Sequence, residues 1–141
     1  MNIKMKALLK SLNVFHFACS PCNNCDIEIL DALTPRYDLE RFGIVLVGSI
    51  RHADVMLVTG MPNRKNAPIL KKTYEQMPQP GVVIAIGSCA LGLGIFKDGY
   101  NTVGTVDSIV PVSAYIPGCP PKPEAMIMGV VKLLNALKAK G

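Results

Sequence analysis

Five cysteines are the residues of this chain best suited to chemistry: Cys19, Cys22, Cys25, Cys89 and Cys119. The first three fall within a single short stretch, and the last two stand alone much later in the chain. Thiolates bind soft metals, and they also act as nucleophiles in thiol–disulfide exchange. The chemistry to be weighed is therefore an iron–sulfur cluster, a structural zinc ion or a redox-active disulfide.

The elements on either side of the first three cysteines predict where these thiols lie. Residues 12–17 (LNVFHF) have the apolar, β-branched and aromatic composition of a short buried strand. Apolar residues then recur at helical spacing from Ile27 to Leu33, with Asp26 and Glu28 in the first turn, where carboxylates suit a helix N-terminus. The cysteines thus lie on a turn between a strand and a helix, where open α/β sheets bind their ligands.

The rest of the chain alternates between strands and helices. We expect buried strands at residues 43–48, 54–60 and 81–87, a helix at 63–77, a glycine-rich loop at 90–108, extended segments at 108–112 and 114–116, and a helix at 124–138. This order predicts an α/β fold with a doubly wound, mostly parallel sheet of about four strands. Cys89 follows the strand at 81–87, and Cys119 follows the last extended segment. Because parallel strands joined by right-handed crossovers end at the same edge, these cysteines should meet Cys22 and Cys25 there.

Length and composition limit the classes of function. The 141 residues predict a single domain (1–141) with a proper core. Half of the residues are apolar and only 18% are charged, so part of the surface should face partner subunits. The net charge is +5, but no arginine-rich stripe with interleaved aromatic residues accompanies it, which argues against nucleic acid as a partner.

Two stretches bear on the membrane. Residues 1–10 predict a short basic amphipathic helix that is either solvated or docked on a membrane-facing partner. The longest uncharged run, at residues 80–96, is interrupted by glycines and is shorter than the roughly 20 apolar residues of a membrane helix. Contact with a membrane would therefore go through another chain or lie along the surface. Thiols kept reduced to bind metal fit a cytosolic location.

The spacing of the cysteines favours a [4Fe–4S] cluster held by Cys22, Cys25, Cys89 and Cys119. Structural zinc sites usually combine cysteines in two tight pairs, whereas here one C-x-x-C pair is joined by two distant single cysteines. Proline directly after Cys119 also occurs in the ferredoxin pattern. Zinc, a thiol–disulfide centre and inert core cysteines remain open as alternatives. The fifth thiol, Cys19, is expected to support the site, or else to bind in place of Cys22.

Three motifs together resemble a known family: residues 22–28 (CNNCDIE), 87–90 (GSCA) and 115–121 (YIPGCPP). They are similar to the small subunit shared by energy-converting [NiFe] hydrogenases and respiratory complex I, including archaeal membrane-bound hydrogenase and sulfur reductase complexes. The resemblance implies a flavodoxin-like fold that carries one [4Fe–4S] cluster on the four cysteines named above. It implies as partners a large catalytic subunit, a two-cluster ferredoxin-like subunit and membrane subunits that pump ions.

The same resemblance implies a function. The chain would be an electron-transfer subunit without catalytic residues, peripheral to the cytoplasmic face of the cell membrane. Complex I subunits carry two adjacent cysteines in the first motif, so the spacing of Cys22 and Cys25 favours reduction of protons or sulfur over a quinone-linked role. A zinc-stabilised α/β interaction module is the alternative from another class. Beside the cluster we expect supporting roles for four residues: Cys19, Glu28, Ser88 and Gly118. His16 is expected to be a hydrogen-bonded core histidine.

Overall fold

The computed structural model describes residues 11–140, and a five-stranded parallel sheet forms its centre. The strands are β1 (Leu12–Ala18), β2 (Ile44–Leu46), β3 (Val55–Thr59), β4 (Val82–Ile86) and β5 (Ala114–Ile116). Their spatial order is β2-β1-β3-β4-β5, and every neighbouring pair is parallel. This is the flavodoxin-like order, in which the chain changes direction between β1 and β3. The predicted α/β fold is confirmed, and β5 joins as a fifth strand.

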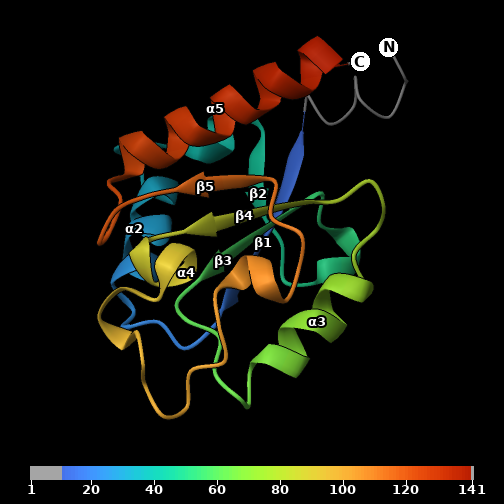
Figure 1. Cartoon of the computed structure of the whole chain (residues 1–141). Helices are drawn as coiled ribbons and strands as arrows, with labels where there is room; N and C mark the ends of the chain where they lie inside the picture. The colour runs from blue at the N-terminus through green and yellow to red at the C-terminus, as the bar shows by residue number, and fades with distance from the viewer. Residues whose placement is uncertain (1–10, 141) are drawn as a thin grey trace.

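Helices cover both faces of the sheet, so the fold has three layers (Figure 1). The helices are α2 (Asn24–Leu33), α3 (Ala67–Glu75), α4 (Ser88–Gly92) and α5 (Pro123–Lys140). Four single turns of 3₁₀ helix complete the structure: η1 (Leu39–Phe42), η2 (Ile50–His52), η3 (Gly94–Phe96) and η4 (Val106–Ser108). Helices α2 and α5 pack on one face, and α3 and α4 pack on the other.

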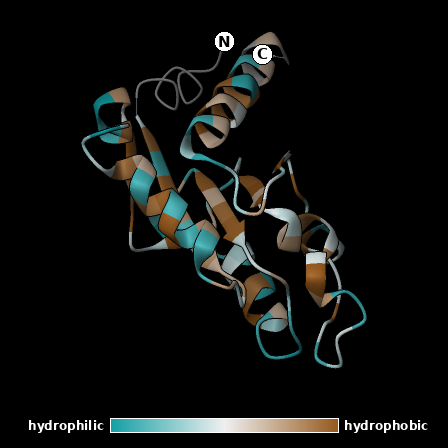
Figure 2. Cartoon of the chain, turned by 90° about the vertical axis from the view of Figure 1, so that its left-hand side faces the viewer, coloured by the Kyte–Doolittle hydropathy of each residue, from teal (hydrophilic) through white to brown (hydrophobic). Residues whose placement is uncertain are grey.

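Two apolar cores fill the spaces between these layers. On β3, Val55 contributes to the core under α2 and α5, and Met56 contributes to the core under α3 and α4. Ile84 and Ala85 of β4 are divided between the two cores in the same way. A parallel strand buried on both faces reads as a continuous apolar run, which is why these strands could be found in the sequence. Figure 2 shows the hydrophobic strands between helices of mixed hydropathy.

The extended segment predicted at 108–112 is wrong over its first three residues. Val106 begins the η4 turn, and the Val110 N–H bonds back to the Val106 carbonyl at 3.1 Å. Both valines are buried in the core beside α4, because a helical turn brings residues four apart onto one face. The loop predicted at 90–108 also contains the end of α4 and two 3₁₀ turns. The helix predicted at residues 1–10 lies outside the described residues. Within residues 11–140, no helix combines the length and the apolar character needed to span a membrane.

Candidate metal centre

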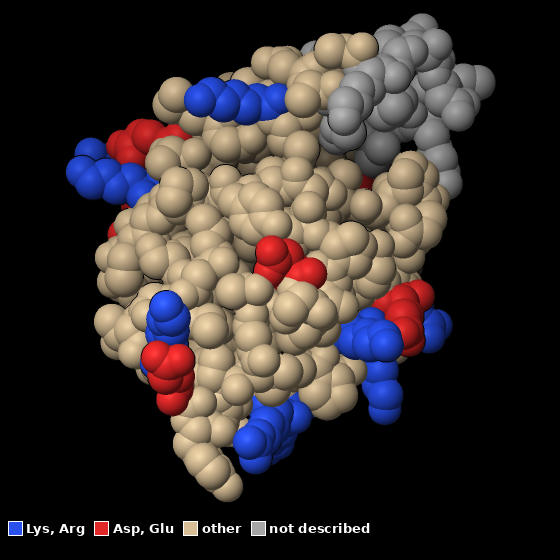
Figure 3. Space-filling view, viewed as in Figure 1, with Lys and Arg blue, Asp and Glu red and all other residues tan. Residues whose placement is uncertain are grey.

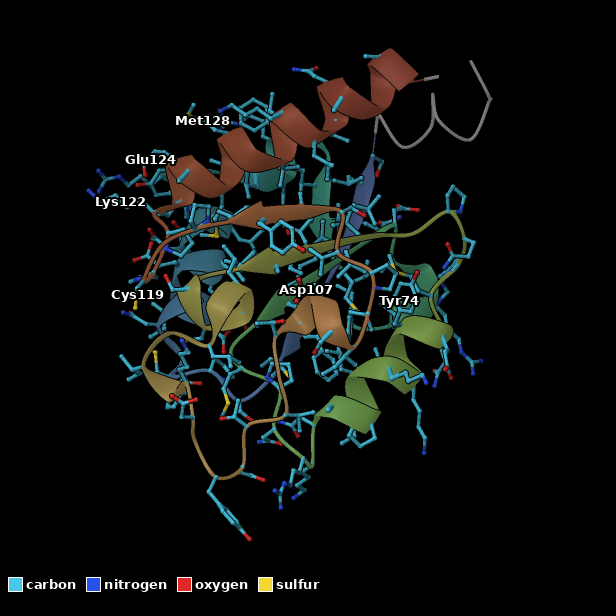
Figure 4. All side chains as sticks on the ribbon, in the orientation of Figure 1. Tyr74, Asp107, Cys119, Lys122, Glu124 and Met128 are labelled. Carbon is cyan, nitrogen blue, oxygen red and sulfur yellow. The ribbon has the colours of Figure 1, made fainter. Side chains whose placement is uncertain are left out.

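The four predicted ligands follow the carboxyl ends of the strands. Cys22 lies in the loop between β1 and α2, and Cys25 is in the first turn of α2. Cys89 is in the first turn of α4, directly after β4, and Cys119 follows β5. In Figure 1 the strand arrows point toward the side where α2 and α4 begin, and Figure 4 labels Cys119 on that side. The predicted meeting of these residues at one edge of the sheet is therefore what the structure displays.

Burial and neighbouring thiols raise the pKa of two cysteines at this edge. Burial raises the pKa of Cys25 to about 11, and Cys22, Cys89, Asp26 and Cys119 add to the increase, in that order. Burial also raises the pKa of Cys89, with further contributions from Cys119 and Cys22. A nearby negative charge disfavours a second one, which is why the other three cysteines of this edge contribute to the shift of Cys25. A bound metal cation would reverse this penalty, because a coordinating thiol is deprotonated.

The four thiols differ in their exposure to solvent. Cys25 and Cys89 are half-buried, whereas Cys22 and Cys119 are exposed. The two helix residues thus form the inner side of the site, and the two loop residues form its rim. This site opens onto the surface of the chain at the end of the sheet.

Gly87 closes the inner side of the site against Cys25. Its φ of 87° lies in the region that L side chains rarely adopt, and a β carbon there would lie 2.6 Å from the Cys25 sulfur. Gly94 also packs against a cysteine: a β carbon added to Gly94 would lie 3.4 Å from the Cys89 sulfur. Glycine at these positions lets the backbone approach the sulfur atoms closely.

Ser88 and Gly118, both predicted to support the site, are brought together. The Ser88 N–H and hydroxyl groups both donate to the Gly118 carbonyl, at 2.8 and 3.1 Å. The Gly87 N–H donates to the Ile116 carbonyl at 2.9 Å. These bonds fasten the loop that carries Cys119 to the turn that carries Cys89.

A second set of contacts holds the loop of Cys22, and sequence reasoning missed it. Ser20 Oγ accepts hydrogen bonds from the side-chain amides of Asn63 and Asn66, at 2.5 and 2.6 Å. The Cys19 N–H donates to the Thr59 carbonyl at 2.8 Å. Gly60, with a φ of 80°, packs directly against the backbone of the cysteine loop. The segment between β3 and α3 therefore braces the loop between β1 and α2.

Asp26 joins the site to the middle of the sheet. Its Oδ1 accepts a hydrogen bond from the Thr59 hydroxyl at 2.6 Å and lies 3.0 Å from His16 Nε2. His16 Nε2 is also 3.0 Å from Thr59 Oγ. The histidine is thus partly buried and has polar partners, as predicted, while Thr59 was not recognised in the sequence. Glu28, in the next part of α2, is half-buried.

Cys19 occupies a different environment. Its side chain is fully buried in the core under α3 and α4, together with Met56 and Val58. Burial raises its pKa to about 11, against the opposing effect of a hydrogen bond from the Asn63 N–H. The fifth thiol therefore lies in the core, and its supporting role at the site stays a prediction.

The chemistry of the donor set limits the groups that it could hold. Within residues 11–140, no three or more His, Cys, Asp or Glu side chains stand close enough together to hold one metal ion. Four cysteine thiolates are soft ligands that suit an iron–sulfur cluster or a structural zinc ion.

Comparison with known protein families gives one match over most of the chain. The model of the NADH ubiquinone oxidoreductase 20 kDa subunit matches residues 22–133. A relative named probable membrane-bound hydrogenase subunit mbhJ, from Pyrococcus furiosus, is 52% identical over 124 residues, which are 88% of this chain and 74% of the relative. A second relative, from Methanosarcina mazei, is named as part of an F(420)H(2) dehydrogenase. It is 44% identical over 128 residues, 91% of this chain and 70% of that protein.

Solved structures agree with these relatives. A chain of the membrane-bound sulfane sulfur reductase, an archaeal respiratory membrane complex, superposes with a TM-score of 0.82 at 40% identity. The match covers 94% of this chain and 73% of that one. A chain of an NAD⁺-reducing [NiFe]-hydrogenase superposes with a TM-score of 0.70 over 89% of this chain and 92% of that one, but at 17% identity it shares the fold alone.

Proposed function

The chain belongs to the family of the NADH ubiquinone oxidoreductase 20 kDa subunit, and from this premise we propose that it is an electron-transfer subunit carrying one [4Fe–4S] cluster. The family places it among subunits of membrane-bound hydrogenase, sulfur reductase and complex I-like oxidoreductases. We further propose that residues 1–141 act as a single domain whose task is to hold the cluster beside the active site of another subunit.

The proposed ligands are Cys22, Cys25, Cys89 and Cys119. The observation that carries this assignment is the placement of the four cysteines just after the carboxyl ends of parallel strands, at one edge of the sheet. The close approach of Gly87 to the Cys25 sulfur supports it, because such a backbone position leaves no room for a side chain beside the site. The chemistry that the cluster supplies when bound is the uptake and release of one electron.

The protein residues around the thiols hold them in place and limit the access of water. Cys25 and Cys89 bind from the half-buried inner side, where the first turns of α2 and α4 keep their backbones rigid. Cys22 and Cys119 bind from the exposed rim, where the Ser88–Gly118 contacts hold the second loop. The substrate chemistry belongs to another polypeptide, so no residue of this chain is assigned a catalytic role.

Exposed apolar side chains support a partner at this edge. Ile27 and Leu30 on α2 are 60% and 57% exposed, and Ile95, just beyond α4, is 90% exposed. We propose that a large catalytic subunit covers them together with the cluster. Figure 3 shows a second surface with few charges, between α5 and α3, where Asp107 (labelled in Figure 4) stands apart from other charged side chains.

The wider assembly follows from the family. We propose that a two-cluster ferredoxin-like subunit delivers the electrons and that membrane subunits pump ions. The chain would then lie at the cytoplasmic face of the cell membrane, as a peripheral part of a hydrogenase or sulfur reductase complex. The names of the similar proteins support membrane attachment of such complexes.

Anaerobic purification of the full chain with its copurifying subunits tests the proposal. The large subunit is then removed or its metals are counted separately, so that iron and zinc can be assigned to this chain. We expect about four iron atoms per chain, a brown chromophore and a paramagnetic signal after reduction with dithionite. A colourless chain with one zinc ion would support the interaction module instead.

A further inference from the structure

We propose that Thr59 and His16 fix the carboxylate of Asp26 next to the cluster, and that this fixed charge lowers the reduction potential of the cluster. The inference rests on the proposed function, because it assigns a role toward the cluster that Cys25 binds. Asp26, Thr59 and His16 are positioning residues and touch no substrate.

The carboxylate is held through one oxygen atom. Thr59 donates its hydroxyl hydrogen to Asp26 Oδ1 at 2.6 Å, and His16 Nε2 lies 3.0 Å from the same oxygen. Since the hydroxyl hydrogen of Thr59 is used on Asp26, the Thr59 oxygen can only accept from His16, which is 3.0 Å away. Both neighbours of Nε2 are then acceptors, so the hydrogen of this ring must lie on Nε2.

The sheet makes this arrangement rigid. Ala18 and Thr59 are register partners on β1 and β3, the two strands that flank the switch point of the fold. Thr59 is fully buried, so its hydroxyl has no water to exchange for Asp26. His16 and Asp26 are 21% and 18% exposed in their side chains, which limits screening of the charge. The sheet thus presents two donors at a fixed place, and the first turn of α2 brings Asp26 onto them.

The fixed charge acts on the site because Asp26 directly follows Cys25. Asp26 and Cys25 are adjacent residues in the first turn of α2, so the fixed negative charge lies beside the proposed ligand. The negative charge of the Asp26 carboxylate disfavours the addition of one more electron to a cluster bound by Cys25. Cluster potentials respond to net charge, hydrogen bonding and exposure, and a fixed anion near the ligand is such a charge.

Potentiometric titration of the full chain in its complex, followed by EPR with dithionite as the electron donor, tests the inference. Asp26→Asn removes the charge and keeps the shape, so its midpoint potential should shift upward while the iron content stays at the wild-type value. Asp31→Asn is the matched control: it makes the same change in the last part of the same helix and should leave the potential close to that of the wild type. Equal potentials for Asp26→Asn and wild type, at equal iron content, would overturn the inference and leave the proposed function intact.

A second pair of variants separates positioning from folding. Thr59→Val removes the hydroxyl from a buried site at nearly constant volume, so the carboxylate loses its shortest hydrogen bond. We expect a broadened EPR signal and a displaced potential, and Thr59→Ser should restore both. A Thr59→Val signal identical to that of the wild type would contradict the proposal even if Asp26→Asn loses its cluster. A wild-type chain without iron would instead refute the proposed function.

Discussion

The backbone of Gly87 lies directly against the sulfur of Cys25: a β carbon on Gly87 would come within 2.6 Å of that sulfur atom. The two residues are far apart in the sequence: Cys25 is in the first turn of α2, Gly87 directly follows β4, and both lie beyond the carboxyl edge of the sheet. This contact joins two of the three segments that supply the proposed ligands. At this position the site is bordered by backbone atoms and not by a side chain.

Replacement of Gly87 by alanine should therefore remove most of the cluster. The added methyl group would displace Cys25, and the φ of 87° would cost about 1–3 kcal/mol for a residue with a side chain. The iron content and the visible absorption of the purified chain measure the loss. Gly92→Ala is the control, since a β carbon there meets nothing within 4 Å and the φ is ordinary. Full iron occupancy in Gly87→Ala would show that Cys25 does not bind the cluster in this position.

Serine substitutions should divide the five cysteines into two groups. Each of Cys22→Ser, Cys25→Ser, Cys89→Ser and Cys119→Ser should lose the normal cluster signal, because each removes one proposed thiolate ligand. The measurement is iron per chain together with the EPR spectrum. A thiol–disulfide centre made of Cys22 and Cys25 would instead keep its redox activity when Cys89 or Cys119 is replaced.

Cys19→Ala should keep its iron, because the Cys19 side chain lies fully buried in the core under α3 and α4. The small cavity should lower the free energy of unfolding by about 1–2 kcal/mol, as measured by chemical denaturation under anaerobic conditions. If Cys19→Ala lost as much iron as the four serine variants, Cys19 would have to be counted among the cluster ligands.

The Cys19 thiol also predicts a pH dependence of stability. Its pKa is about 11 in the folded chain, above the ordinary thiol value of 9.0, because burial disfavours the thiolate. The folded state therefore keeps the proton where the unfolded state loses it, so this contribution to stability is complete below pH 9 and is lost as the pH rises through about 11. Between these two pH values the free energy of unfolding should fall less steeply for Cys19→Ala than for the wild type. If the free energies of unfolding of Cys19→Ala and the wild type changed with pH in parallel, the raised pKa of the buried Cys19 thiol would be contradicted.

Gly60→Ala tests the contact between Gly60 and the backbone of the loop that carries Cys22. An added β carbon would lie 2.5 Å from the Cys19 carbonyl oxygen and from the Pro21 nitrogen, and both are backbone atoms that cannot turn aside. We expect a loss of stability of at least about 1–3 kcal/mol from the φ of 80° alone, with iron lost in addition. Gly48→Ala should be neutral, since its β carbon would meet nothing within 4 Å. Normal thermal stability of Gly60→Ala would show that the loop is not held by this contact.

The main features of the site could be predicted because they depend on local patterns. Continuous apolar runs identified β1, β3 and β4, and the rule that parallel strands end at one edge placed Cys22, Cys25, Cys89 and Cys119 there. The last strand, β5, has only three residues, so its membership of the sheet depended on pairing with β4 rather than on its own composition.

The parts that sequence reasoning missed depend on register and on distant contacts. Thr59 reaches Asp26 only because β1 and β3 pair in the observed register, and nothing near Thr59 in the sequence indicates a polar partner. The position of Cys19 depends on where β1 ends: one residue of alternation decides which face of the sheet a side chain joins. At 108–112, the buried pair of Val106 and Val110 favoured a helical turn over the predicted extended segment.

The most direct test of the account is an anomalous-difference map at the iron absorption edge, measured on anaerobic crystals of the chain with its large subunit. We predict one compact group of iron density at the carboxyl edge of the sheet, in contact with the sulfur atoms of Cys22, Cys25, Cys89 and Cys119. Iron density that omits any of these four sulfurs, or a site that responds only at the zinc edge, would contradict the account.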